Sequence, residues 1–157
     1  MMMRQIAITV ILLSLLFILS PSAYATDIRY CDKKTDYEVK VHGVEISPDP
    51  VARGQPATFS ISASAGNAIS SGKLDLDVAY FGWHVHSETR DLCTETSCPF
   101  SIGDFVISHS QVLPIFTPPG SYTLRMKILD ANKRQLSCVA FDFSIGFGSS
   151  MAANFLM

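Results

Sequence analysis

The sequence predicts an all-β protein, a sandwich of about seven strands in two antiparallel sheets. Two observations carry this prediction. Short runs show apolar and polar side chains in alternation, and clusters of glycine, proline, aspartate and asparagine separate those runs. Alternation with a period of two is typical of strands with one buried face. No segment shows helical periodicity over about 12 residues, so the prediction includes no long helix beyond the N-terminal leader.

The alternation is clear in five runs. The first begins at Tyr37 and carries its apolar face past Gly43 to Ile46, where a proline-rich loop follows. In the second, the odd positions are apolar and the even positions carry hydroxyl groups. The last two are separated by a turn at 130–133. The five predicted strands cover residues 37–46, 58–63, 74–78, 120–128 and 139–145.

The apolar positions change parity after the third run. They are even in 74–78 and odd at Phe81, Trp83 and Val85. Because successive side chains of a strand point to opposite faces, this slip predicts a bulge or bend near 79–82 within one continuing strand. The bend would bring these bulky side chains to one end of the sandwich. The pattern alone is equally typical of ordinary core residues.

A second apolar cluster lies in 112–120, where three prolines predict a loop. Loops normally run over the surface. Exposed Ile115 and Phe116 would therefore indicate a pocket rim, a membrane-touching tip or a contact with a partner. The alternative is a loop that folds back over the core.

Residues 1–25 are typical of a cleaved signal peptide. Arg4 precedes an apolar stretch at 6–19, and Ala23-Tyr24-Ala25 fits the small-x-small cleavage rule. An uncleaved signal anchor is the alternative. Residues 26–157 are then one domain in an oxidising compartment, either secreted or in the lumen of the endomembrane system, extracellular or in a vacuole- or lysosome-like organelle. Residues 147–157 are expected to be a flexible tail, with a vacuolar sorting signal as the alternative.

The four cysteines, Cys31, Cys93, Cys98 and Cys138, predict a disulfide framework in an exported chain. Three pairings are open. The spacing favours Cys93–Cys98, which only four residues separate, together with Cys31–Cys138. The second pair would close a loop of about 100 residues, which is worth roughly 4–5 kcal/mol in the chain-entropy model.

The charged residues argue against nucleic acid as a partner. After removal of residues 1–25, 11 Lys and Arg face 14 Asp and Glu, a net charge of −3, and no basic stripe is present. The sequence contains no nucleophile elbow, no metalloprotease helix motif and no phosphate-binding glycine loop, so we expect neither an enzyme nor a cofactor. His84 and His86 could supply two metal ligands from one strand face, but solvent-facing histidines are the expectation and no metal is predicted.

Several short motifs occur in a fixed order along the chain. They are Val44-Glu45-Ile46-Ser47-Pro48, Arg53-Gly54-Gln55, the segment 93–99 with its two cysteines, Leu113-Pro114 and Gly120-Ser121-Tyr122. Their order and spacing resemble the ML lipid-recognition domain family, which includes the Niemann-Pick type C sterol carrier and plant relatives described as phospholipid or sterol transfer proteins. The resemblance covers Asp27 to about Gly146. Where the sterol carrier has a third disulfide, this chain has Pro48-Asp49-Pro50.

The resemblance implies an immunoglobulin-like sandwich that holds a lipid between its sheets, admits it through one open end, and has the disulfides Cys31–Cys138 and Cys93–Cys98. It places the mouth of the pocket at Phe81, Trp83, Val85, Ile115 and Phe116. It also implies an apolar cavity lined by Phe59, Leu76, Leu124, Met126, Ile128, Phe141 and Phe143.

The expected function is therefore non-enzymatic binding and transfer of a sterol or a phospholipid. Phe116 and Trp83 would touch the bilayer transiently while the lipid enters or leaves, and a receptor is a further expected partner. The alternative is a secreted immunoglobulin-like interaction module in defence or signalling, with a filled core and no lipid. The volume of the cavity discriminates between the two.

Overall fold

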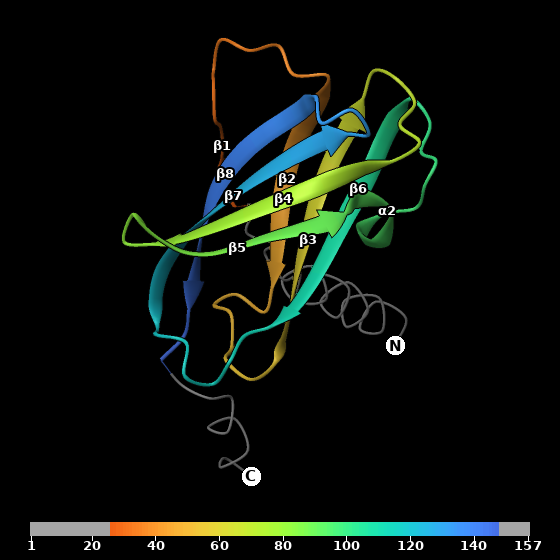
Figure 1. Ribbon diagram of the computed structural model, residues 1–157. Coiled ribbons are helices and arrows are strands. Elements are labelled where there is room, and N and C mark those ends of the chain that lie inside the picture. Colours follow the sequence, from red (N-terminus) through yellow and green to blue (C-terminus); the bar gives the residue numbers. More distant parts are fainter. Residues whose placement is uncertain (1–25, 148–157) are drawn as a thin grey trace, which may run out of the picture.

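Figure 1 shows the computed structural model of the protein, which describes residues 26–147. The predicted signal peptide and residues 148–157 of the predicted tail lie outside the described residues. Within 26–147 the chain forms eight strands and the four-residue helix α2 (Leu92–Glu95). The strands are β1 (Ile28–Tyr30), β2 (Val39–Ser47), β3 (Pro56–Ala65), β4 (Gly72–Tyr80), β5 (Trp83–Asp91), β6 (Gly103–Val112), β7 (Gly120–Asp130) and β8 (Gln135–Ile145).

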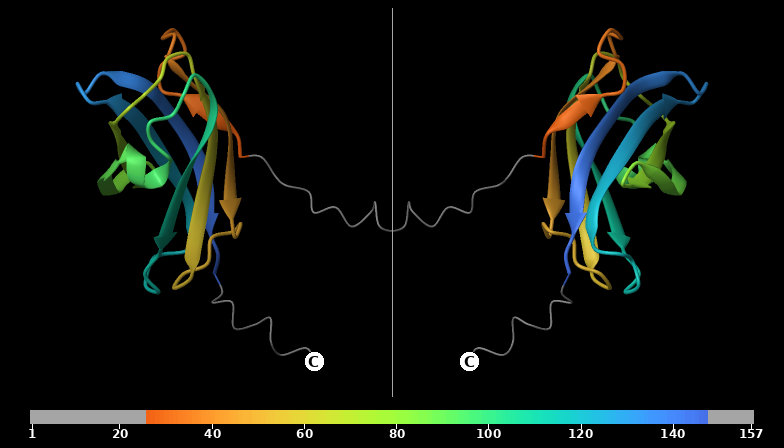
Figure 2. Two further views of the ribbon diagram at one scale, coloured as in Figure 1. Left: turned by 90° about the vertical axis from the view of Figure 1, so that its right-hand side faces the viewer. Right: turned by 90° about the vertical axis from the view of Figure 1, so that its left-hand side faces the viewer.

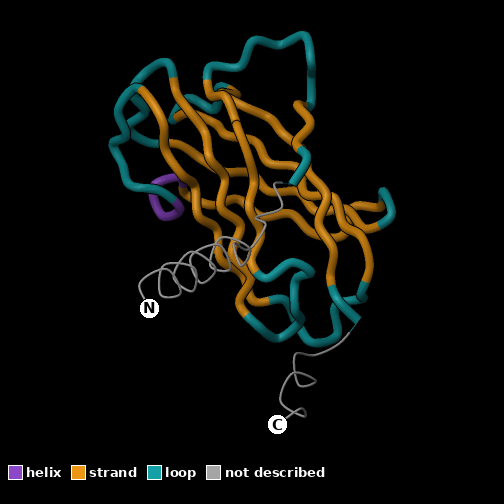
Figure 3. Tube along the Cα trace, turned by 180° about the vertical axis from the view of Figure 1, so that it is seen from behind, coloured by secondary structure: helices purple, strands orange, loops and turns teal. Residues whose placement is uncertain are grey.

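The strands form two sheets that lie face to face, as the side views in Figure 2 show. One sheet has the order β1-β8-β7-β4-β5 and the other has the order β2-β3-β6. All the pairings between these strands are antiparallel. The predicted sandwich of two antiparallel sheets is confirmed, with eight strands in place of about seven. Seen from behind, most of the chain is strand, with loops at the strand ends (Figure 3).

The core lies between the inner faces of the sheets. In β3 the odd positions Phe59, Ile61 and Ala63 are buried, and in β7 the even positions from Tyr122 to Ile128 are buried. This is the alternation that the sequence shows, because a strand in a two-layer sandwich turns every second side chain inward. Burying these side chains is the main driving force for the fold, at ~25 cal/mol per Å² of apolar surface.

Two disulfides fasten the sandwich, and both predicted pairings are confirmed. Cys31 is bonded to Cys138, which ties the segment after β1 to β8 across a sequence separation of 107. Cys93 is bonded to Cys98 and closes the loop that holds α2. Two disulfides in a chain of this size fit an oxidising compartment.

The apolar positions change from even to odd near 79–82 because of a turn, and not because of the predicted bulge or bend within one strand. The chain does not continue as one bent strand. It reverses at Phe81 and Gly82, and Tyr80 pairs with Trp83 across the reversal. Both turn residues have positive φ, 48° and 82°, as a two-residue hairpin with matching twist requires. A hairpin changes parity just as a bulge does, so the sequence pattern alone does not distinguish them.

Candidate functional site

A cavity of about 450 Å³ lies between the two sheets. Its apolar wall is formed by side chains from β3 of the three-stranded sheet and from β4, β7 and β8 of the five-stranded sheet. The alternative of an interaction module required a filled core without a cavity. The presence of this cavity therefore argues against that alternative. The apolar side chains within the sandwich that line the cavity are Phe59, Leu76, Val78, Leu124, Phe143 and Ile145.

Aromatic rings form much of this wall. Phe59 of β3 meets Phe143 of β8 edge to face, with 5.4 Å between ring centroids. Phe143 also stacks on Tyr122 at 5.5 Å, and Tyr122 lies 4.6 Å from the ring of Tyr80. Burial, and then the neighbouring Tyr80, raise the pKa of Tyr122. Its hydroxyl therefore stays neutral and donates a hydrogen bond of 2.7 Å to the Pro118 carbonyl.

Four of the seven predicted lining residues, Phe59, Leu76, Leu124 and Phe143, do line the cavity. Met126, Ile128 and Phe141 do not line it, and their side chains are completely buried. They point inward as expected, but other side chains of the core cover them completely, so they do not reach the cavity. Alternation identifies the inner face of a strand and gives no information on where along it the cavity ends.

The five predicted mouth residues are divided in a similar way. Val85 and Phe116 line the cavity, and both are exposed, so the cavity reaches the surface beside them. Phe81, Trp83 and Ile115 are not part of the lining and are 72%, 79% and 76% exposed. Phe81 belongs to the hairpin turn, where its ring packs against Tyr80 at 4.5 Å. Phe81 and Trp83 neighbour Tyr80, and Ile115 precedes Phe116, so all three adjoin residues of the lining without belonging to it.

The mouth loop, residues 113–119, is fastened to the sandwich while its tip remains exposed. On one side the Gly54 amide donates to the Leu113 carbonyl at 2.7 Å. The Arg53 guanidinium donates to the carbonyls of Ile115 and Thr117 at 3.5 and 3.4 Å, and to that of Phe147 at 2.9 Å. On the other side the Tyr80 hydroxyl donates to the Pro119 carbonyl at 3.1 Å.

The turn before β3 could not carry a side chain at Gly54. The backbone there has a φ of +71°, and an added Cβ would lie 2.8 Å from the Ile115 side chain. Leu113 of the mouth loop packs against the core, whereas Phe116 is 84% exposed. The loop therefore folds back only at its base, and its tip presents bulky apolar side chains to the surroundings.

A polar wall completes the cavity, and sequence reasoning missed it. It consists of His86 and Glu88 from β5 and His109 and Gln111 from β6. These two strands are the edges of their respective sheets. Every residue of 86–90 is polar, so the sequence carries no alternation that would separate a face turned toward a cavity from a face turned toward solvent.

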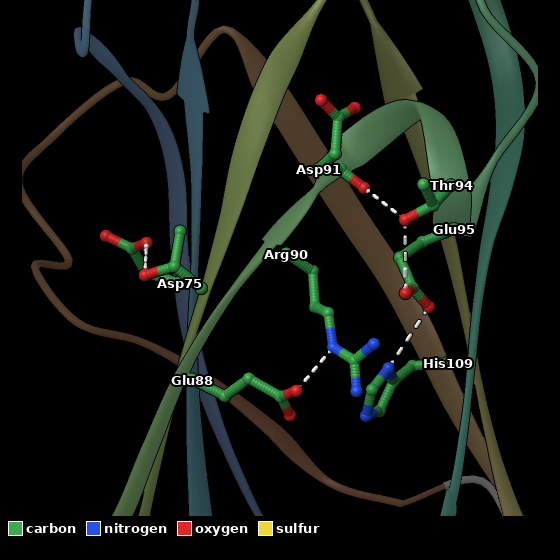
Figure 4. A network of polar contacts seen from close by, with 8 residues as sticks. Asp75, Glu88, Arg90, Asp91, Thr94, Glu95 and His109 are labelled. Atoms are coloured by element: carbon green, nitrogen blue, oxygen red, sulfur yellow. Dashed lines mark hydrogen bonds and ion pairs between the residues drawn. The ribbon is translucent and has the colours of Figure 1, made fainter.

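Ion pairs organise this polar wall, as Figure 4 shows. The imidazole Nδ1 of His109 lies 3.1 Å from the carboxylate Oε2 of Glu95, and both side chains are buried. Glu95 belongs to α2, so this pair fastens the disulfide loop to β6. The carboxylate of Glu88 lies 2.5 Å from the guanidinium Nε of Arg90.

His84 and His86 do not share a strand face, contrary to the expectation. Val85 is an extra residue in the ladder, since Ala79 pairs with His84 and Val78 pairs with His86. His84 consequently points to the outer face, where its Nδ1 lies 2.5 Å from the carboxylate of Asp77. His86 lines the cavity.

Residues 26–147 contain no cluster of three side chains suited to a metal ion. No helix among these residues is long and apolar enough to cross a membrane.

Comparisons with known proteins agree with this architecture. The family model of the ML domain matches residues 25–145. The chain is 33% identical over 137 residues to a candidate phosphatidylglycerol/phosphatidylinositol transfer protein of Dictyostelium discoideum, covering 85% of this chain and 94% of that protein. It is 33% identical over 149 residues to the MD-2-related lipid-recognition protein ROSY1 of Arabidopsis thaliana, covering 90% of this chain and 89% of that one.

Solved structures show the same fold. A Niemann-Pick type C2 protein from the Japanese carpenter ant superposes with a TM-score of 0.60 at 14% identity, covering 75% of this chain and 99% of that one. Chicken MD-1, solved in complex with lipid IVa, superposes with a TM-score of 0.52 at 16% identity, covering 74% of this chain and 86% of that one. These two structures show the fold. The match of the ML-domain family model to residues 25–145, together with the relative that is 33% identical, shows that the chain belongs to the ML domain family.

Proposed function

We propose that the protein binds one lipid molecule in the cavity between its sheets and carries it between membranes without making or breaking covalent bonds. One observation carries the proposal. The sandwich encloses a cavity of about 450 Å³, lined mainly by apolar side chains, that reaches the surface beside exposed aromatic residues. Small-molecule sites occupy about 300–1,000 Å³ and are mostly apolar, so this space suits a sterol or acyl chain.

The names of the relatives support the proposal. The relatives in Dictyostelium discoideum and Arabidopsis thaliana are named for phospholipid transfer and lipid recognition. A lipid taken from water into the cavity would gain ~25 cal/mol for each Å² of apolar surface that it buries. Both phospholipids and sterols carry enough apolar surface for this driving force, and the apolar wall by itself selects for shape.

Membrane contact is the second part of the proposal. Trp83, Ile115 and Phe116 are 79%, 76% and 84% exposed around the opening, where water solvates them poorly. Insertion of these side chains into the headgroup region would bring the opening against the bilayer, so that a lipid could pass between the membrane and the cavity without crossing water. A lumenal or extracellular location fits the disulfides, and a receptor that takes over the loaded protein is a further proposed partner.

The test is a transfer assay between vesicles. Donor vesicles would carry a phospholipid or a sterol labelled on its apolar part, and acceptor vesicles would be unlabelled. We expect the protein, expressed as residues 26–157 with its disulfides formed, to accelerate transfer of at least one of the two lipids in proportion to its concentration. Transfer no faster than without protein, for both lipids, would overturn the proposed transfer function.

A further inference from the structure

The inner face of β5 is polar where the fold calls for apolar residues. β5 pairs with β4, and the inward side chains of β4 opposite it are Leu74, Leu76 and Val78. Their partners across the ladder are Arg90, Glu88 and His86. An edge strand that only covered a core would be expected to place apolar side chains at such positions. Two of these polar residues, His86 and Glu88, line the cavity, so we look for a reason other than packing.

Several of these polar groups lack partners within residues 26–147. His86, which is exposed, and Gln111, which is half-buried, both line the cavity, and neither has a side-chain hydrogen bond to another described residue. The guanidinium Nε of Arg90 is buried and makes no well-aligned hydrogen bond, although it lies beside the Glu88 carboxylate. Native proteins satisfy nearly all their buried polar groups, so this Nε is the atom in the group that calls for an explanation. His109, by contrast, is already paired with Glu95.

We propose that three residues of the polar wall, His86, Glu88 and Gln111, hold the head of the bound lipid and select lipids whose head donates hydrogen bonds. The inference rests on the proposed lipid binding and adds the class of ligand. Glu88 is the selective group, because an ionised carboxylate only accepts hydrogen bonds. It can therefore bind a hydroxyl or an ammonium head, whereas a choline head offers it no N–H or O–H.

The remaining polar groups complement the carboxylate. Arg90 is a positioning residue, since its guanidinium lies 2.5 Å from Glu88 and offsets the charge of that carboxylate. Gln111 and His86 can each donate as well as accept, so they can bind phosphate oxygens of the same lipid. Phe59 and Phe143 lie on the apolar side of the cavity, where the acyl chain would lie. The lipid would thus be oriented with its head toward β5 and β6.

The test measures preference between lipid heads. Delipidated protein would be incubated with vesicles containing phosphatidylinositol, phosphatidylglycerol, phosphatidylethanolamine or phosphatidylcholine with identical acyl chains, and with cholesterol in a separate arm. The bound lipid would be extracted and quantified. We expect the first three to be bound more than phosphatidylcholine. In Glu88→Gln, the preference for phosphatidylinositol over phosphatidylcholine should fall about tenfold, the size expected for a charge-assisted hydrogen bond.

Two further variants provide a second test and a control. Gln111→Leu removes a lining group that has no partner in the described chain, so it should fold normally and also lower the preference. Glu45→Gln makes the same chemical change on the exposed outer face of β2 and should leave the preference unaltered.

Equal binding of all four phospholipids, or an unchanged preference in Glu88→Gln, would overturn this inference while leaving lipid binding intact. Because the hydroxyl of cholesterol also donates a hydrogen bond, bound cholesterol should likewise fall in Glu88→Gln, and cholesterol binding that is unchanged in this variant would also overturn the inference. Binding of no lipid at all would refute the proposed function itself.

Discussion

Phe59 of the three-stranded sheet and Phe143 of the five-stranded sheet meet edge to face between the two layers, with 5.4 Å between their ring centroids. Both rings also line the cavity. The contact therefore joins the two sheets within the wall of the cavity. Met126 and Phe141 are fully buried and do not line the cavity, although Leu76 and Leu124, their partners on the neighbouring strands, do.

Filling the cavity should abolish lipid binding and preserve the fold. Val78 is half-buried and lines the cavity from β4, so the indole of Val78→Trp would occupy the volume proposed for the lipid. We expect bound fluorescent phospholipid and sterol to be lost. The unfolding free energy should fall by no more than about 1–3 kcal/mol, the usual cost of overpacking.

The neighbouring residue provides a matched control for this substitution. Ala79 pairs with His84 on the outer face of the same sheet, and its side chain does not line the cavity. Ala79→Trp should therefore bind lipid as the unaltered protein does. Lipid binding by Val78→Trp at the unaltered level would place the ligand elsewhere.

Removing an exposed aromatic side chain from the mouth should slow transfer while leaving binding in place. Phe116 is 84% exposed, and burying a phenylalanine side chain in an apolar environment is worth about 1.5–3 kcal/mol. We expect Phe116→Ser to slow transfer between vesicles by about tenfold. Val106→Ser, which removes an exposed apolar side chain from the outer face of β6, is the control and should transfer normally. Unchanged transfer by Phe116→Ser would refute the role of this residue in membrane contact.

Arg53 should determine how firmly the mouth loop is held. Its guanidinium donates to three carbonyls, two of them in that loop, and each such bond is worth about 1 kcal/mol. In Arg53→Leu we expect faster hydrogen exchange of the Thr117 amide, which donates to the Pro114 carbonyl at 3.0 Å. Arg125→Leu, on the outer face of β7, should leave that exchange rate unchanged. Equal protection of Thr117 in Arg53→Leu would show that the tyrosines and Gly54 hold the loop without it.

Acid should weaken the attachment of β1 to β8. Hydrogen bonds from Arg29 and Thr123 hold the pKa of Asp142 below 3.8, the value that applies to the unfolded chain. A carboxyl whose pKa is lower in the folded state stabilises the fold above the unfolded pKa, and this contribution is lost as the pH falls through the folded pKa. Because Arg29 and Asp142 are 47% and 48% exposed, the contribution should be at most about 1 kcal/mol.

The measurement for this pair is the unfolding free energy as a function of pH. The unaltered protein should be more stable than Asp142→Asn at pH 6, and the difference should vanish as the pH falls well below 3.8. A difference that persists undiminished in acid would mean that the pair contributes through packing and not through charge.

The sequence predicts those strands whose inner face is apolar along its whole length. β3 and β7 meet this condition, and β8 meets it from Val139 to Ile145, so their alternation predicts the sandwich and its core. β5 does not, because His86, Glu88 and Arg90 stand where apolar residues would otherwise mark the inner face. The element that carries the most distinctive part of the candidate site is therefore the one whose strand signal is weakest.

The candidate site was predictable only in its apolar part. Phe59, Leu76, Leu124 and Phe143 share the features that sequence patterns detect, namely bulk and an inward face. Whether an inward side chain reaches the cavity depends on how the two sheets pack at that point along the strand. The sequence pattern does not contain this information, so it does not distinguish Ile128 from Leu124. Glu88 and Gln111 come from edge strands of different sheets, and only their meeting across the cavity gives them a role.

Native mass spectrometry, combined with extraction and identification of bound lipid, shows directly whether the cavity holds a lipid. The protein would be produced as residues 26–157 in a eukaryotic secretory host and would be measured beside Val78→Trp. We expect a lipid bound at close to one molecule per chain in the unaltered protein and little or none in Val78→Trp. A mass without lipid that stays unchanged after incubation with sterol and phospholipid vesicles would refute lipid binding in the cavity.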